Sequence, residues 1–239
     1  MISNRQEKLL DFLVREYVRT AKPVSSALAA DKSHLHLSSA TIRNEMNDLE
    51  HQGFLLHLHT SGGRVPTDKA YRHFVDSLLK NDISLDLGAE YKNKIRQALI
   101  GVSSDPREIN QVVARVLSNL SENLVITGIS NDEDFFKKGL AGLFEHPEFR
   151  ETNKIFQLAN FFEEFEGMFK FIEREFFNTL GMPRGVPVQV LIGGESPFKQ
   201  IQHETVMCAK YSLPGDCVGS LTLVGPTRMD YEKNISLIK

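Results

Sequence analysis

Residues 38–50 read SSATIRNEMNDLE, and this stretch decides the fold of the N-terminal region. Its apolar residues recur at i, i+4 and i+7, which is the spacing of a buried face on an α-helix: Ile42, Met46 and Leu49. Ser38 or Ser39 can cap the first amides of such a helix. Gly53 follows in the position that favours a left-handed terminal residue. The sequence therefore predicts a helix from Ser39 to about Gln52.

The segments around this helix complete an order that is typical of one DNA-binding fold. Apolar spacing predicts an amphipathic helix over about 4–20, and a second short helix follows Pro23 over about 24–31. Downstream, Leu56 and Leu58 alternate with histidines, which predicts a half-exposed strand. A glycine-containing turn at 60–63 then leads into a return strand. Three helices followed by a β-hairpin form a winged helix-turn-helix, and a further helix over about 67–80 leads out of this domain.

The face of the 39–52 helix opposite its apolar stripe presents small or hydrogen-bonding side chains, which we interpret as DNA-binding residues: Ser39, Thr41, Arg43, Asn44 and Asn47. Arginine pairs with guanine O6 and N7, and asparagine pairs with adenine. The helix N-terminus adds free amides that suit a phosphate. An ordinary solvated helix face is the alternative, and the surrounding helices and hairpin disfavour it.

The hairpin tip is the second candidate contact, and we assign its residues to the DNA-binding set: His59, Thr60, Ser61, Gly62, Gly63 and Arg64. Two glycines let a tip approach a phosphate closely, and Arg64 supplies positive charge just beyond it. A solvent-exposed turn is the alternative. We expect Arg43 to govern discrimination between sequences and Arg64 to hold all DNA evenly.

Charge is divided unevenly along the chain. Residues 1–80 carry 11 Lys and Arg against 9 Asp and Glu, whereas residues 81–239 carry 17 against 22. A slightly positive head on an acidic body suits local contact with nucleic acid. No apolar run approaches the ~18 residues that span a bilayer, and the N-terminus lacks a signal-peptide core. We therefore expect a cytoplasmic protein without a membrane partner.

The second region, 81–239, begins with a polar linker at 81–88, and we expect the rest of it to form an α+β domain. Helices are expected at about 88–101 and 106–121, and a strand at 124–129. A block at 132–180, which holds most of the phenylalanines, is expected to be helical. Further strands are expected at 187–193, 204–212 and 217–225, with a last helix from about 229. The sheet should be small and mainly antiparallel.

Catalytic, cofactor and metal sites are not predicted. No nucleophile elbow, phosphate loop or Ser/His/Asp set is recognisable. Histidines cluster in the head, but no cysteine or carboxylate group beside them completes a closed metal site. Cys208 and Cys217 flank a predicted turn at 213–216, and Cys208 should lie opposite a residue near 220. The open alternative is a ligand- or metal-sensing winged-helix regulator with a small-molecule pocket in the C-terminal domain.

Several separated motifs resemble the HrcA family of heat-inducible transcription repressors. They stand in the family's order: Glu16-Tyr17 to Pro23-Val24-Ser25, Ser38 to Glu50, Gly53-Phe54-Leu55, His59 to Arg72, Leu143 to Phe149, Ile192 to Pro197 and Gly219 to Tyr231. The resemblance implies a homodimeric repressor of chaperone genes that binds an inverted-repeat operator, called CIRCE, on double-stranded DNA and is released on heat stress. It also implies assistance by the chaperonin GroEL and a GAF-like dimerisation domain. Typical members are longer, so this chain resembles a shortened member with an abbreviated GAF-like domain and no inserted domain.

Overall fold

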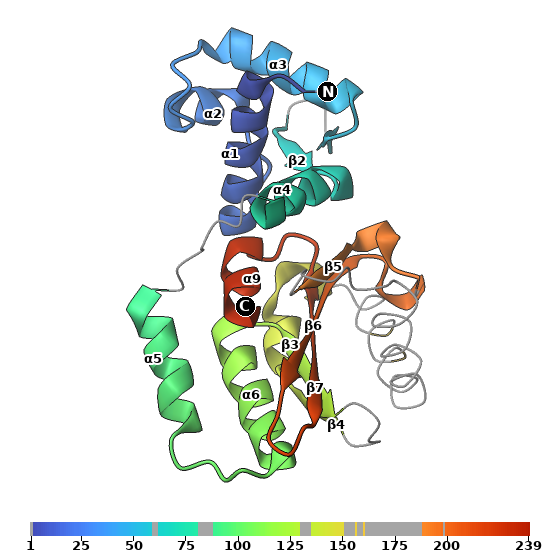
Figure 1. Cartoon of the computed structure of the whole chain (residues 1–239). Coiled ribbons are helices and arrows are strands. Elements are labelled where there is room, and N and C mark those ends of the chain that lie inside the picture. Colours follow the sequence, from blue (N-terminus) through green and yellow to red (C-terminus); the bar gives the residue numbers. More distant parts are fainter. Residues whose placement is uncertain are drawn as a thin grey trace. The chain divides into compact units, whose positions relative to one another are not determined.

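The computed structural model describes residues 2–58, 62–80, 88–129, 135–150, 188–197 and 199–239, together with positions 156 and 160. The chain divides into two compact units, coloured along the sequence in Figure 1. Unit 1 comprises Met1–Ile83 and Thr227–Asp230, and unit 2 comprises Ser84–Pro226 and Tyr231–Lys239. Among the described residues, no helix has the length and apolar character needed to cross a bilayer.

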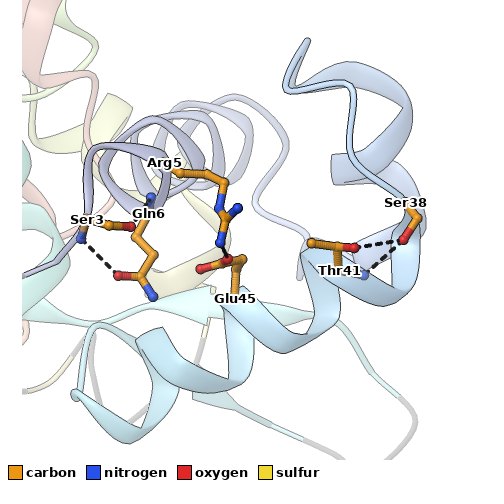
Figure 2. Close-up of polar contacts among 6 residues, drawn as sticks. All are labelled: Ser3, Arg5, Gln6, Ser38, Thr41 and Glu45. Carbon is orange, nitrogen blue, oxygen red and sulfur yellow. Dashed lines mark hydrogen bonds and ion pairs between the residues drawn. The ribbon is translucent and has the colours of Figure 1, made fainter.

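Unit 1 is built from helices and a short antiparallel strand pair. Its elements are α1 (Asn4–Thr20), α2 (Ser26–Lys32), α3 (Ser39–His51), β1 (Leu55–His57), β2 (Arg64–Pro66) and α4 (Asp68–Lys80). The order and approximate positions are those expected from the sequence. At the start of α1, the Gln6 amide donates to Ser3 Oγ at 3.2 Å and the Ser3 amide donates to Gln6 Oε1 at 3.0 Å, which forms the capping box drawn in Figure 2.

The apolar stripe predicted for α3 is buried. Ile42, Met46 and Leu49 are all fully inaccessible to solvent. They pack in a unit whose other large buried side chains come from α1 and α4, including Leu9, Leu10, Leu13, Tyr71 and Phe74. Burying one full stripe fixes which side of α3 remains at the surface.

The hairpin register differs from the alternation that the sequence indicated. β1 pairs with β2 so that Leu55 lies opposite Pro66 and His57 opposite Arg64. Leu55 is the buried leucine, whereas the side chains of Leu56 and Leu58 are about half exposed. A shift of one residue along a strand exchanges its two faces, so His57, not Leu56, shares the inner face with Leu55.

Unit 2 is an α+β assembly around an antiparallel sheet. Its larger elements are α5 (Gly88–Leu99), α6 (Pro106–Ser121), β3 (Leu124–Ile129), β4 (Phe135–Lys138), α7 (Leu140–Glu145), β5 (Gln189–Ile192), β6 (Glu204–Ser212), β7 (Val218–Pro226) and α9 (Tyr231–Ile238). The strand order is β4-β3-β7-β6-β5, and every neighbouring pair is antiparallel.

Both faces of the sheet are covered. On one face lies α6, whose Asn110 carbonyl accepts a hydrogen bond from Thr127 Oγ1 of β3 at 2.9 Å. The other face carries an apolar cluster in which sheet residues pack against α7 and two short 3-10 turns, at Pro147–Arg150 and Lys199–Ile201: Leu124, Ile126, Leu143, Phe149, Ile201, Val206, Cys208 and Val224. Because both faces are covered, every residue of β3 is buried, and its one hydroxyl, that of Thr127, is hydrogen-bonded to α6.

Two expectations for unit 2 need correction. Residues 135–138 were expected to be helical, but they form β4 and pair with β3. Cys208 lies opposite Thr222, two positions beyond the residue near 220 that the hairpin suggested. The turn centre is as expected, with the Leu213 amide donating to the Cys217 carbonyl at 2.9 Å. The predicted helical region over 161–180 lies outside the described residues.

Candidate nucleic-acid interface

Helix α3 begins and ends at residues suited to those positions. Ser38 is its N-cap, because its hydroxyl accepts from the Thr41 amide at 3.1 Å and lies 2.9 Å from Thr41 Oγ1, as Figure 2 shows. At the other end, Gly53 has a φ of 77°. That left-handed conformation lets the Phe54 amide donate to the Leu49 carbonyl at 2.9 Å. The helix is therefore capped at both ends within unit 1.

Arg43 and Asn44 are the predicted DNA-binding residues of α3 that are exposed. Both side chains are exposed on α3, on the side away from Ile42 and Met46. Within the described part of the chain, no hydrogen bond or ion pair engages either side chain. A guanidinium and a carboxamide side by side on a fixed helix can each make bidentate contacts with a base edge.

Ser39 and Thr41 lie at the start of α3 and already have protein partners. Ser39 Oγ is 3.2 Å from Ser26 Oγ on α2, and Thr41 Oγ1 bonds the cap residue. Both residues are half buried. Their hydroxyls therefore hold the α2–α3 junction and the start of α3.

A partly buried ion pair links α3 to α1. Glu45 is buried in the apolar stripe, and its carboxylate accepts a hydrogen bond from the Arg5 guanidinium at the start of α1 (Figure 2). The Arg5 side chain is 55% exposed. Sequence reasoning missed this pair. The available signal was that Glu45 falls on the buried side of the helix by its spacing, where a carboxylate needs a partner.

Arg64 does not lie where the sequence led us to expect it. Its side chain is only 9% exposed. The guanidinium donates through Nε to Glu50 Oε2 at 2.7 Å and through Nη2 to Asn47 Oδ1. A side chain held in this way is directed toward α3, whereas the sequence led us to expect it to face a phosphate.

The hairpin glycines also have a role inside the unit. A Cβ on Gly63 would lie 2.5 Å from the Val24 carbonyl carbon, which is closer than real contacts allow. At the same place Val24 and Arg64 exchange two backbone hydrogen bonds of 2.9 Å. Gly62 is exposed, and its carbonyl accepts from His57 Nε2 at 2.9 Å. His59, Thr60 and Ser61 lie outside the described residues.

Unit 2 contains a small apolar cavity of about 170 Å³. It lies among α5, α6, β6, β7 and α9, and its polar lining comes from Lys210 and Tyr211. The Tyr211 hydroxyl donates to Asn110 Oδ1, and burial raises the pKa of this tyrosine. Typical ligand pockets are larger, roughly 300–1,000 Å³. The cavity suits a small apolar molecule more than a polar effector.

Comparison with known proteins gives a consistent result. The family described as "HrcA protein C terminal domain" matches residues 39–235. The heat-inducible transcription repressor HrcA of Thermoanaerobacter pseudethanolicus is 26% identical over 331 aligned positions, which cover 99% of this chain and 94% of that protein. The same repressor of Lachnoclostridium phytofermentans is 26% identical, with 100% and 95% covered.

Length and fold can also be compared. The alignment with the first of these repressors has 331 positions whereas this chain has 239 residues, so at least 92 positions have no counterpart here. A solved structure titled "Crystal structure of a hypothetical protein at 2.2 A resolution" has a TM-score of 0.78 at 21% identity, with 99% of this chain and 95% of that chain covered. This similarity concerns the fold.

Proposed function

The chain belongs to the HrcA family of heat-inducible transcription repressors, and we propose from this premise that unit 1 is a winged helix-turn-helix that binds operator DNA. The observation that carries the proposal is the state of α3. One stripe of this helix is fully buried, and Arg43 and Asn44 project from the opposite side. A helix fixed in this way presents the same side chains to every duplex it meets.

In this proposal the first half of α3 lies in the major groove. Arg43 reads guanine, Asn44 reads adenine, and Asn47 contacts a neighbouring base. Ser39, Thr41 and the amides at the helix start lie near a phosphate. The hairpin tip, His59 to Gly62, contacts the DNA backbone as a wing, with Gly63 at its base. Arg64 is excluded from the DNA-contacting set because its guanidinium is bound within unit 1.

We further propose that unit 2 is an abbreviated GAF-like dimerisation domain. Two copies would place two α3 helices on an inverted-repeat operator of the CIRCE type, since a two-fold dimer matches a two-fold site. Heat would release the repressor by loosening unit 2 or its dimer, and the chaperonin GroEL would assist recovery of the active fold. Family membership supports these statements, and we assign the protein no catalytic role.

Competition binding tests the DNA-binding proposal. Full-length protein is titrated onto a labelled inverted-repeat duplex in the presence of the same duplex or a scrambled one. We expect selective binding that is weakened by Arg43→Ala and Asn44→Ala. Arg96→Ala is the matched control, because Arg96 is also exposed but lies on α5 in unit 2. Equal competition by both duplexes would contradict the proposal.

A ligand-regulated repressor is the second candidate, and the apolar cavity in unit 2 is the observation that favours it. A molecule that binds the folded state raises the melting temperature as its concentration rises. Thermal-shift screening with small apolar molecules therefore tests this candidate. Leu117→Trp fills the cavity. If a molecule raises the melting temperature of this variant as much as that of the wild type, the molecule binds elsewhere.

A further inference from the structure

Arg64 lies where three segments of unit 1 meet. Its backbone pairs with Val24, which precedes α2, through two hydrogen bonds of 2.9 Å. Within the hairpin it lies opposite His57. Its side chain reaches α3, where it bonds Glu50 and Asn47. One residue thus links the hairpin base to the segment before α2 and to the exposed edge of the proposed recognition helix.

We propose that Arg64 is a positioning residue that also sets the base preference of Asn47. The proposal rests on the function proposed above. The Arg64 contacts hold the hairpin base against α3, so that the wing and the exposed face of α3 are presented to DNA in one arrangement rather than several.

The bond from Arg64 also fixes the orientation of the Asn47 amide. A guanidinium has only donors, so the Asn47 atom that it bonds must be the oxygen. The amide oxygen is then directed toward Arg64, and the NH₂ group is the end that is directed away from Arg64 and toward a base. Adenine recognition by asparagine is bidentate and uses both the oxygen and the NH₂ group. Asn47 is therefore set to donate to an acceptor such as guanine O6 or N7, and Asn44 remains the residue suited to bidentate adenine contact.

The chemistry of the site requires arginine. Burying a charge is unfavourable unless it is paired and hydrogen-bonded, and Glu50 Oε2 at 2.7 Å supplies the pair. The planar fork of arginine can bond the carboxylate and the amide at once, whereas the ammonium group of lysine is a point charge without this geometry. His57 adds to the same cluster, with its Nδ1 4.0 Å from Glu50 Oε1.

Salt-dependent binding separates a positioning role from a phosphate contact. If Arg64 positions α3 and the hairpin, Arg64→Ala lowers operator affinity by about tenfold or more. The slope of log K against log [salt] stays at the wild-type value, because no phosphate contact is lost. Glu50→Gln should weaken binding in the same direction, and Arg64→Lys should not restore it. The double variant Arg64→Ala, Glu50→Gln should lose little more operator affinity than Arg64→Ala alone.

A phosphate contact predicts the opposite pattern. Arg64→Ala would then reduce the salt slope by about 0.9, Arg64→Lys would retain most of the affinity, and Glu50→Gln would strengthen binding by removing a negative charge. Any of these results overturns the proposal. Failure of the wild-type protein to select the inverted repeat would instead contradict the proposed function, so the two failures are distinguishable.

Asn47→Asp keeps the test independent of folding. The aspartate retains an oxygen for Arg64 but replaces the NH₂ donor with an acceptor. We expect an unchanged melting temperature, and loss of discrimination at a guanine-containing position of the operator relative to its base-substituted version. Asn44→Asp introduces the same charge one helical turn away and should reduce discrimination at a different operator position, one that contains adenine. If Asn47→Asp alters discrimination at an adenine instead, the inferred amide orientation is wrong.

Discussion

Replacing Gly63 by alanine tests how the hairpin base is held. The new Cβ would lie 2.5 Å from the Val24 carbonyl carbon, 2.6 Å from the Val24 oxygen and 2.7 Å from the Pro23 carbonyl carbon. All three atoms belong to the backbone, so no side chain can rotate away. Either the segment before α2 moves, or the hairpin base separates from it.

The two responses reduce the free energy of unfolding by similar amounts. Forcing an extra carbon into a packed site destabilises a protein by about 1–3 kcal/mol. Separation instead breaks the two backbone hydrogen bonds between Val24 and Arg64, which contribute about 0.5–1.5 kcal/mol each. We therefore expect Gly63→Ala to destabilise unit 1 by about 1–3 kcal/mol. For a unit of this size, the melting temperature should fall by roughly 5–20 °C.

A comparison with Gly53 separates the steric cause from a conformational one. Gly53 has a φ of 77° and open space around the site of a Cβ, so alanine there meets only the left-handed backbone penalty of about 1–2 kcal/mol. Asparagine tolerates that conformation, so Gly53→Asn should be less destabilised than Gly53→Ala. Asparagine at Gly63 should recover nothing, because its Cβ meets the same atoms.

Differential scanning calorimetry of the full chain measures the melting temperature, and hydrogen exchange of the Val24 and Arg64 amides reports the hairpin base directly. Gly63→Ala should accelerate exchange at both amides, whereas Gly53→Ala should not. A Gly63→Ala protein that melts within about 2 °C of wild type, with both amides protected, would refute the reasoning.

Other substitutions test the cap of α3 and the interior of unit 2. Ser38→Ala removes the N-cap oxygen of α3 and should destabilise unit 1 by about 0.5–2 kcal/mol in calorimetry; no change would show that the cap contributes nothing. Tyr211→Phe leaves the buried Asn110 oxygen without its hydroxyl donor and should destabilise unit 2 by about 1–3 kcal/mol. A Tyr211→Phe protein that is as stable as wild type in a urea titration would contradict this expectation. Burial raises the pKa of the Cys208 thiol to about 12. Alkylation at pH 8 should therefore label Cys217 in the native protein and Cys208 only after unit 2 unfolds, and rapid labelling of both thiols at low temperature would be inconsistent with this burial.

Local patterns in the sequence predicted the helices of unit 1 well. The spacing of Ile42, Met46 and Leu49 identified the buried stripe of α3, and Gly53 marked its end. These features depend on residues within a few positions of one another, so a single segment contains the information. The exposed position of Arg43 follows from the same periodicity.

Features that depend on distant partners were not predictable in the same way. Glu45 pairs with Arg5, 40 positions away, and Arg64 of β2 bonds Glu50 of α3, 14 positions away. Charge and position near a turn made Arg64 resemble a phosphate ligand, but the fold turns its side chain toward α3. Gly63 was explained by access to DNA, whereas close approach of Val24 requires it.

Short alternation predicted the first strand of the hairpin but not its buried face, and it missed β4. Leu56 and Leu58 have the pattern of a buried face, but one residue of shift puts Leu55 inside and both of them outside. The strand Phe135–Lys138 has only four residues, which is too short for its sequence pattern to distinguish it from the helix expected there. Pairing with β3 determines its structure.

The most direct test of the central claim is a base-by-base comparison of wild type and Arg43→Ala. Affinities of the full-length proteins are measured for the inverted repeat and for variants in which each base pair of a half-site is replaced in turn. If α3 reads DNA as proposed, Arg43→Ala should lose about 1–3 kcal/mol of discrimination at one guanine position and its two-fold mate, while other positions remain selective. An Arg43→Ala protein that discriminates at every position as wild type does would contradict the account.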